Sequence, residues 1–208
     1  MTDRKERRKI KSKWKKLFFG LLVLNIAVVI IFLALIFWPV PDNVSYPENE
    51  ATPQDESSEF VVRTTKQNLN DLVNAYTEQL LEGTRHQYRI ELDEDVHLIG
   101  ELPVFSSTVP LSAHLEPLVQ ENGDIILKQK SISIGLLELP NKKIMEYIGK
   151  YLPMPDWVTV NPAEEEIYVA VTEMDIRSNF EVGVEHIDLE ANNLAFRIRI
   201  PYRTLGID

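Results

Sequence analysis

Residues 88–119 read YRIELDEDVHLIGELPVFSSTVPLSAHLEPLV, and apolar side chains alternate with polar ones along most of this stretch. Alternation with a period of two is typical of strands that bury one face. The tetrapeptide ENGD at 121–124 follows, and Asn-Gly is the strongest short signal for a tight hairpin. We therefore predict an antiparallel meander in which the strand ending near Val119 pairs with one that begins near Ile125.

Two segments beside this meander have helical spacing. Residues 64–83 carry apolar side chains three and four positions apart before Gly83, and residues 141–152 do the same before Pro153. Further alternating runs lie at 157–160, 167–171, 182–184 and 194–202. The order of elements predicts an α+β fold, with an antiparallel sheet of meandering strands packed on two amphipathic helices.

The N-terminal region has a different pattern. Leu17 to Trp38 is an uncharged run of 22 residues whose one strongly polar side chain is Asn25. At about 1.5 Å per residue, a helix of this length spans the roughly 30 Å hydrocarbon core of a bilayer. A cleaved signal peptide has a shorter apolar region and a small-residue cleavage site, which we do not find here. We therefore predict an uncleaved transmembrane helix over 17–38.

Charge predicts the orientation of this helix. Nine Lys and Arg residues and two acidic residues precede the span, and basic clusters of this kind remain cytoplasmic. The predicted organisation is a basic cytoplasmic leader at 1–16, the transmembrane helix at 17–38, a Pro- and acid-rich linker at 39–58, and an extracytoplasmic α+β domain at 59–208. The expected location is the cell membrane, with the N-terminus in the cytoplasm.

The charge of the outer part excludes one class of partner. Residues 39–208 carry 13 basic and 30 acidic side chains. A nucleic acid requires a basic face, so we expect none as a partner. The chain contains no cysteine, so an apolar core and not disulfides must hold the domain together.

Motifs for catalysis are missing from the sequence. We find no G-x-S-x-G, phosphate-binding glycine loop, dinucleotide fingerprint or H-E-x-x-H, and the four histidines have no common ligand spacing. A charged turn explains the acidic run at 93–95 more simply than a Ca²⁺ site. We therefore expect no enzymatic activity, no cofactor and no metal site.

An apolar cleft leaves almost no motif, so the absence of motifs is compatible with lipid binding. We expect such a cleft between the first amphipathic helix and the inward faces of the strands. Its candidate lining residues are Leu69, Leu72, Val73, Tyr76, Val109, Leu111, Leu194, Phe196, Ile198 and Ile200. An ordinary filled core is the alternative for any one of them.

Several phrases of the sequence resemble a known family. The basic leader and span, the helix TTKQNLNDLVNAY, and the segments GELPVFSSTVPLSAHLEP, SISIGLLELPNKKIMEYIGKYLP and LAFRIRIPY are similar to the YpmS family of membrane-anchored proteins from Firmicutes. The resemblance covers nearly the whole chain and implies neither an activity nor site residues. More loosely, a helix against a curved meander resembles lipid-binding domains of the TULIP type.

These observations lead to one functional hypothesis and one alternative. We expect a single-pass, membrane-anchored, non-enzymatic protein that binds a lipid or another amphiphile at the cell envelope. The alternative is an interaction or scaffold protein for an envelope enzyme or complex. The expected partners are therefore the membrane, a lipid or amphiphile, and an envelope protein.

Overall fold

The structure is a computed structural model that describes residues 3–36, 57–104, 107–135, 140–174, 176 and 180–202. The side chains of residues 3–15, 103, 104 and 107 are not described. Residues 1–39 and 40–208 form two compact units, and each is considered by itself. Most of the expected linker, residues 39–56, lies outside the described residues, as do the last two residues of the expected span, 37 and 38.

Helix α1 (Asp3–Ile36) forms the N-terminal unit. Its segment Lys16–Ile36 has a mean hydropathy of 3.0 and is long enough to cross a membrane. Asn25, in the middle of this segment, donates from Nδ2 to the carbonyl of Leu21 at 3.0 Å, one turn earlier in the helix. A helix of this length and composition fits either a membrane anchor or a signal sequence.

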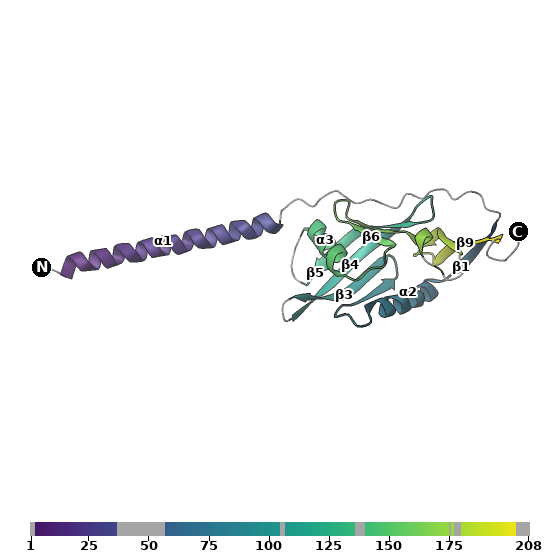
Figure 1. The fold of residues 1–208 in the computed structure, drawn as a ribbon, viewed down its shortest axis with the longest axis horizontal. Coiled ribbons are helices and arrows are strands. Elements are labelled where there is room, and N and C mark those ends of the chain that lie inside the picture. Colours follow the sequence, from purple (N-terminus) through teal and green to yellow (C-terminus); the bar gives the residue numbers. More distant parts are fainter. Residues whose placement is uncertain are drawn as a thin grey trace. The chain divides into compact units, whose positions relative to one another are not determined.

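Six antiparallel strands form the larger sheet of the second unit (Figure 1). The predicted hairpin is confirmed, because Val119 pairs with Ile125 across the turn that contains Gly123. Gly123 has a φ of +95°, a conformation that suits glycine. In spatial order the strands are β2 (Gln87–Leu92), β3 (Val96–Val104), β4 (Ser107–Val119), β5 (Ile125–Ile134), β7 (Glu166–Val169) and β6 (Val158–Asn161).

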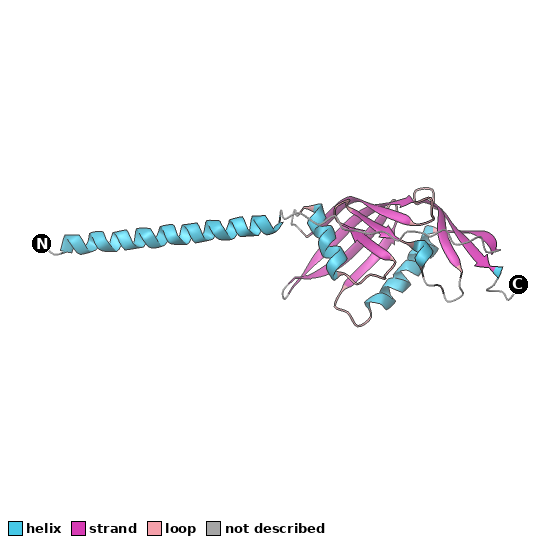
Figure 2. Cartoon of the chain, turned by 45° about the horizontal axis from the view of Figure 1, so that its top comes forward, coloured by secondary structure: helices cyan, strands magenta, loops and turns pink. Residues whose placement is uncertain are grey.

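The larger sheet is curled into a half-barrel (Figure 2). Its register shifts between His114 and Leu115, so that Lys130 of β5 has no residue opposite it on β4. A bulge of this kind bends the strand and increases its twist. The bulge therefore contributes to the concave face on which the core lies.

A second, three-stranded sheet was not predicted as a separate unit. It contains β1 (Ser57–Thr64), β9 (Asn193–Pro201) and β8 (Glu181–Asp188), in that order. Strand β1 is a new element, and its first two residues fall within the expected linker. It pairs antiparallel with β9, from Ser57 opposite Pro201 to Thr64 opposite Leu194, so the two ends of the domain lie side by side.

The two amphipathic helices are confirmed as α2 (Lys66–Leu81) and α3 (Asn141–Tyr151). Helix α2 begins after Thr65, whose hydroxyl accepts the N–H of Asn68 at 3.3 Å. One detail was wrong: Val171 was expected in a strand but lies in a short 3₁₀ helix, η1 (Val171–Glu173). In this turn the N–H and the hydroxyl of Thr172 both donate to the buried Asp124 carboxylate, at 3.0 and 2.8 Å, and these bonds stabilise the turn.

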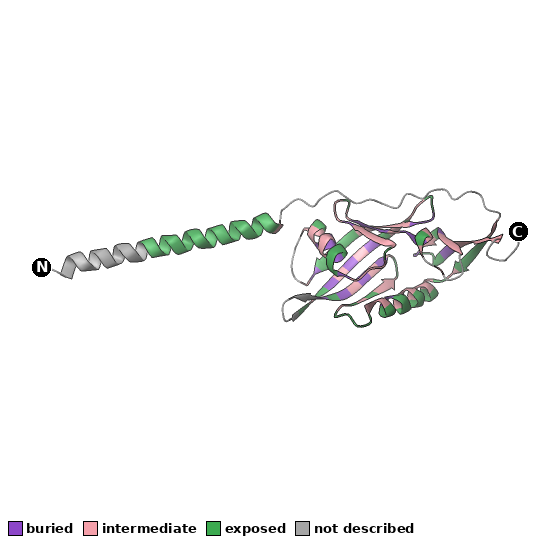
Figure 3. Ribbon diagram, viewed as in Figure 1, coloured by how far each residue is buried: buried purple, intermediate pink, exposed green. Residues whose placement is uncertain are grey.

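The core lies on the concave face of the larger sheet, between the strands and α3. Three side chains of α3, Ile144, Met145 and Ile148, are almost completely buried there. Figure 3 shows buried residues concentrated along the strands, whereas the outer face of α2 is exposed. The predicted α+β class is therefore confirmed, with two antiparallel sheets in place of one.

Candidate functional site: an apolar cavity beside helix α2

A cavity of about 670 Å³ lies within the domain, bounded by α2 and by strands of both sheets. Binding pockets for small molecules commonly measure about 300–1,000 Å³. None of the residues that line this cavity carries a charged side chain. An occupant would therefore be held mainly by apolar contact, because a charged group inside would find no oppositely charged side chain in the lining.

Six of the ten predicted cleft residues line the cavity, and the other four lie elsewhere. The six are Leu69, Leu72, Val73 and Tyr76 of α2, and Phe196 and Ile198 of β9. Leu111 and Leu194 are fully buried in the core instead. Val109 packs at the turn beside Gly135, and Ile200 lies near the end of β9 opposite Ser58.

Most of the wall opposite α2 was not among the predicted residues. It comes from the inward positions of β2, β3, β5 and β7, such as Ile90, Leu98, Leu127 and Ile167. Their alternation was visible in the sequence, but alternation identifies only the inward face. Which part of that face meets α2 depends on the curl of the sheet and on the position of the helix.

The wall contains hydroxyl groups with partners of their own. The hydroxyl of Thr77 donates to the carbonyl of Val73 at 2.8 Å, within α2. Tyr88 donates to the carbonyl of Pro153, just beyond α3, and burial raises the pKa of Tyr88 to about 12. Gly100 lies directly opposite Tyr88, and a Cβ at this glycine would come within 2.6 Å of the Tyr88 Cβ. Because Gly100 has no side chain, the Tyr88 side chain can extend from β2 toward the end of α3, where its hydroxyl binds the Pro153 carbonyl.

The edge of the cavity carries exposed apolar side chains. Three residues line the cavity and are also exposed to solvent: Val62 of β1, and Leu72 and Tyr76 of α2. The ring of Tyr76 lies 5.8 Å from that of Trp157, which also lines the cavity. We therefore take these three exposed residues as the mouth of the cavity.

Helix α2 is fixed beside the cavity by two asparagines. Asn74 makes two hydrogen bonds to the backbone of Ile90, and Asn70 accepts the N–H of Leu92 at 3.1 Å. Strand β2 is the outer strand of its sheet, so these amides satisfy backbone groups that a further strand would otherwise satisfy. The helix is thereby held at the edge of the half-barrel, with its apolar stripe toward the cavity.

A second group of side chains lies on strands β3 and β4. His97 and His114 pair across the strands with their rings stacked 3.9 Å apart, an arrangement that the sequence spacing did not reveal. Asp95 contacts His114 Nδ1 at 3.0 Å and Lys130 Nζ at 3.4 Å, and its pKa is lowered by these two partners despite the opposing effect of burial. Within the described residues, no group of three or more His, Asp or Glu side chains is placed to hold a metal ion. The contacts with His114 and Lys130 therefore explain the position of the Asp95 side chain. Asp95 is the last residue of the acidic run at 93–95, which we expect to be a charged turn.

Comparison with known proteins identifies the family. Residues 12–200 match a family model described as "Uncharacterized protein conserved in bacteria (DUF2140)". The chain is 31% identical over 188 residues to "Uncharacterized protein YpmS" of Bacillus subtilis (strain 168), which covers 89% of this chain and 96% of that protein. Neither description names an enzyme. No solved structure matches, and the looser resemblance to TULIP-type domains stays a prediction. By the family model and by its similarity to YpmS, the chain belongs to the DUF2140 family.

Proposed function

We propose that the domain binds the hydrocarbon part of a lipid or another amphiphile in the cavity beside α2. The observation that carries the proposal is an uncharged cavity of about 670 Å³ that is lined almost entirely by apolar side chains. The size suits a ligand and the lining suits an alkyl chain, whereas a polar head group would remain at the mouth, in water.

The second support is the position of the domain in the chain. The apolar helix α1 precedes it, and twenty residues separate Ile36 from Ser57. We propose that α1 is an uncleaved anchor, with the basic leader in the cytoplasm and the domain outside. Twenty extended residues reach at most about 70 Å, so an anchored domain stays close to its bilayer.

The alternative function, a scaffold for envelope proteins, requires no internal cavity. A filled core would have favoured it, and the cavity therefore favours lipid binding. An enzymatic role has less support. Ser112 Oγ lies 2.8 Å from His97 Nε2, but the neighbouring Asp95 carboxylate binds His114, and no carboxylate among the described residues is hydrogen-bonded to His97 to orient it.

The proposal is tested by photo-crosslinking of the full-length protein in vesicles of phosphatidylcholine and phosphatidylglycerol. A phosphatidylcholine with a diazirine in one acyl chain is included, and the crosslinked peptides are identified after digestion. We expect adducts in α1 and, in addition, on cavity residues of α2, β2 and β3. Adducts confined to α1 would contradict lipid binding by the domain.

A matched pair of variants separates the cavity from nonspecific contact. Val73→Trp places a bulky ring in the cavity beside α2, whereas Ala75→Trp places the same ring on an exposed position of the same helix that does not line it. Val73→Trp should remove most adducts in the domain, and Ala75→Trp should retain them. Adducts in α1 are the internal standard in both variants.

The orientation is tested separately with reporters fused after Asp208. Alkaline phosphatase, which is active only outside the cytoplasm, should be active in this fusion. An inactive phosphatase together with an active cytoplasmic reporter would contradict the proposed topology.

A further inference from the structure

Strand β1 is an edge strand with an unusual surface. It pairs with β9 on one side, and no described strand pairs with its other side. Three consecutive apolar residues on it, Phe60, Val61 and Val62, are 52%, 55% and 45% exposed. A free edge with exposed apolar side chains is a template for pairing with another strand, and proteins usually protect such edges with charge, proline or a covering segment.

The sequence of this edge is complementary to itself. Residues 59–63 read Glu-Phe-Val-Val-Arg, so an antiparallel pair centred on Val61 places Glu59 opposite Arg63 and Phe60 opposite Val62. We propose that β1 pairs in this register with β1 of a second copy of the chain, joining two three-stranded sheets about a twofold axis. Such an isologous contact closes as a dimer and leaves no further edge at β1.

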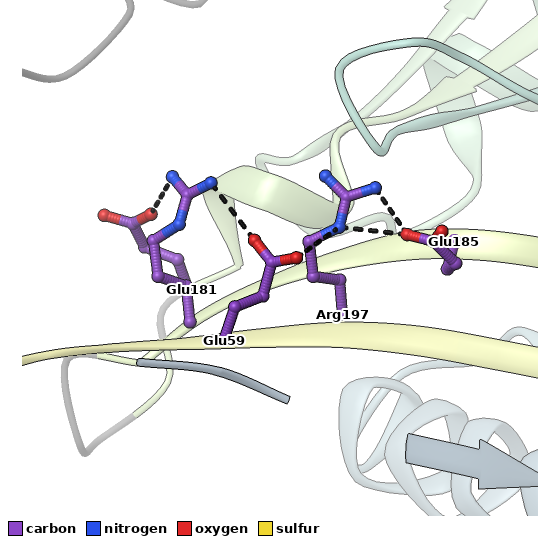
Figure 4. A network of polar contacts seen from close by, with 5 residues as sticks. Glu59, Glu181, Glu185 and Arg197 are labelled. Carbon is purple, nitrogen blue, oxygen red and sulfur yellow. Dashed lines mark hydrogen bonds and ion pairs between the residues drawn. The ribbon is translucent and has the colours of Figure 1, made fainter. Parts of the chain in front are cut away.

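The outer face of the sheet shows what this pairing would supply. Glu59 on β1 contacts Arg197 and Arg199 of β9 at 3.6 and 3.5 Å, and these arginines also bind Glu185 and Glu181 of β8 (Figure 4). Three carboxylates therefore share two guanidinium groups. Arg63 is exposed and makes no ion pair with any described residue. Opposite residues of an antiparallel pair share a face, so Arg63 of the second copy would add the missing positive charge beside Glu59.

The other face of the strand supplies apolar contact. Phe60 and Val62 project to the face that also carries Ile198 and Phe196, their cross-strand neighbours on β9. In the proposed register, each Phe60 lies opposite a Val62 of the second copy. Aromatic and β-branched side chains form favourable cross-strand pairs, and the pairing would cover side chains that are exposed in the single copy.

The inference does not rest on lipid binding, because it uses the free edge of β1, although Val62 of this strand also lies at the mouth of the cavity. Its test uses the lack of cysteine in the native sequence. Full-length Val61→Cys, in membranes, is treated with a mild oxidant and analysed on non-reducing gels. Phe60→Cys and Val62→Cys are treated in parallel, separately and as a mixture of two differently tagged chains.

The register predicts a specific pattern of crosslinks. In this register Val61 lies directly opposite Val61 of the second copy. The two copies of residue 60 lie diagonally across the pair, about 7–8 Å apart, which is too far for a disulfide, and the same holds for residue 62. We expect Val61→Cys to give about fivefold more disulfide dimer than Phe60→Cys or Val62→Cys alone. The mixture of Phe60→Cys and Val62→Cys should give the heterodimer between the two tags.

Charge provides a second readout at the same position. In the Val61→Cys background, Arg63→Glu should sharply reduce the disulfide dimer, because it places two acids opposite each other. Arg85→Glu, the same change on an exposed loop residue, should leave the dimer unchanged. Equal crosslinking at positions 60, 61 and 62, or no more dimer from Val61→Cys than from the exposed Thr84→Cys, would overturn the proposal.

Discussion

Asn74 binds both backbone polar groups of Ile90, as a neighbouring strand would. Its Oδ1 accepts the Ile90 N–H at 3.0 Å, and its Nδ2 donates to the Ile90 carbonyl at 2.7 Å. At Ile90, the outer edge of β2 is therefore hydrogen-bonded to helix α2 and not to water. The same contact sets the distance between α2 and the strands, and with it the width of the cavity.

The first prediction concerns this contact. Asn74→Ala leaves the half-buried N–H and carbonyl of Ile90 without their partner, and we expect unfolding to be easier by about 2–3 kcal/mol. Urea unfolding of the full-length protein in detergent micelles measures the change. Gln67→Ala, on the exposed face of the same helix, is the control and should cost less than about 0.5 kcal/mol.

Hydrogen exchange distinguishes a local effect from a global one. In Asn74→Ala the β2 amides should exchange much faster, whereas those of the β4–β5 hairpin should change only with global stability. An unchanged exchange rate at Ile90 would show that Asn74 does not protect the edge of the sheet.

The second prediction is a loss of stability in alkaline solution. Burial is the main cause that raises the pKa of Tyr88 and of Tyr168 from 10.0 to about 12, and for Tyr168 the hydrogen bond to Asp124 adds to it. Between pH 10 and 12 the unfolded chain has lost these protons and the folded chain retains them. Stability is therefore fully present below pH 10 and falls as pH rises toward 12.

Urea midpoints at a series of pH values from 9 to 12 measure this loss. Tyr88→Phe should flatten the decline, because one of the two titrating phenols is gone. Tyr151→Phe, at an exposed position, should leave the decline as it is in the wild type. A wild-type midpoint that stays constant up to pH 12 would contradict the prediction.

Much of this fold could be predicted from the sequence because its strands alternate and its turns carry strong signals. The Asn-Gly turn predicted the β4–β5 pairing, and the helical spacing of apolar residues predicted both helices. Strand β1 was missed because its three consecutive apolar residues do not alternate and follow a Pro- and acid-rich stretch. Its pairing with β9 joins residues 130 to 144 positions apart, from Thr64 opposite Leu194 to Ser57 opposite Pro201, and no local pattern reports such a contact.

The candidate site was predictable only in part, for a related reason. The apolar stripe of α2 follows from its own sequence, so all four predicted helix residues line the cavity. For the strands, periodicity gave the inward face but not the region of it that remains open. Leu111 and Leu194 therefore appeared equivalent to Phe196, although the structure buries the first two in the core.

The third prediction concerns Asp124, which is 2% exposed in the β4–β5 turn. Its carboxylate accepts hydrogen bonds from the Tyr168 hydroxyl, from Asn122 Nδ2 at 2.7 Å, and from the Thr172 N–H and hydroxyl at 3.0 and 2.8 Å. Asp124→Asn replaces one acceptor oxygen with an NH₂ group that faces donors. We expect a loss of about 2–4 kcal/mol in unfolding free energy.

The same urea assay measures the effect of Asp124→Asn. The exposed Asp156 provides the matched change, and Asp156→Asn should cost less than about 0.5 kcal/mol. If the two variants are equally stable, the buried network does not hold the hairpin to η1. A fully unfolded Asp124→Asn protein would place the cost at or above the whole stability of the domain.

The last prediction is that the two ion pairs of Arg197, with Glu59 and Glu185, contribute little to stability. Arg197 binds Glu185 and lies 3.6 Å from Glu59, and the hydrogen bond to Glu185 is the main cause that raises its pKa. All three side chains are 35–46% exposed, so water and salt screen their attraction. Arg197→Met keeps most of the apolar stem and should cost less than about 1 kcal/mol. Raising NaCl to about 1 M, where the Debye length is about 3 Å, should remove most of that difference. A cost above about 2 kcal/mol that persists in high salt would mean that this face of the sheet is shielded from solvent, as a covering partner would shield it.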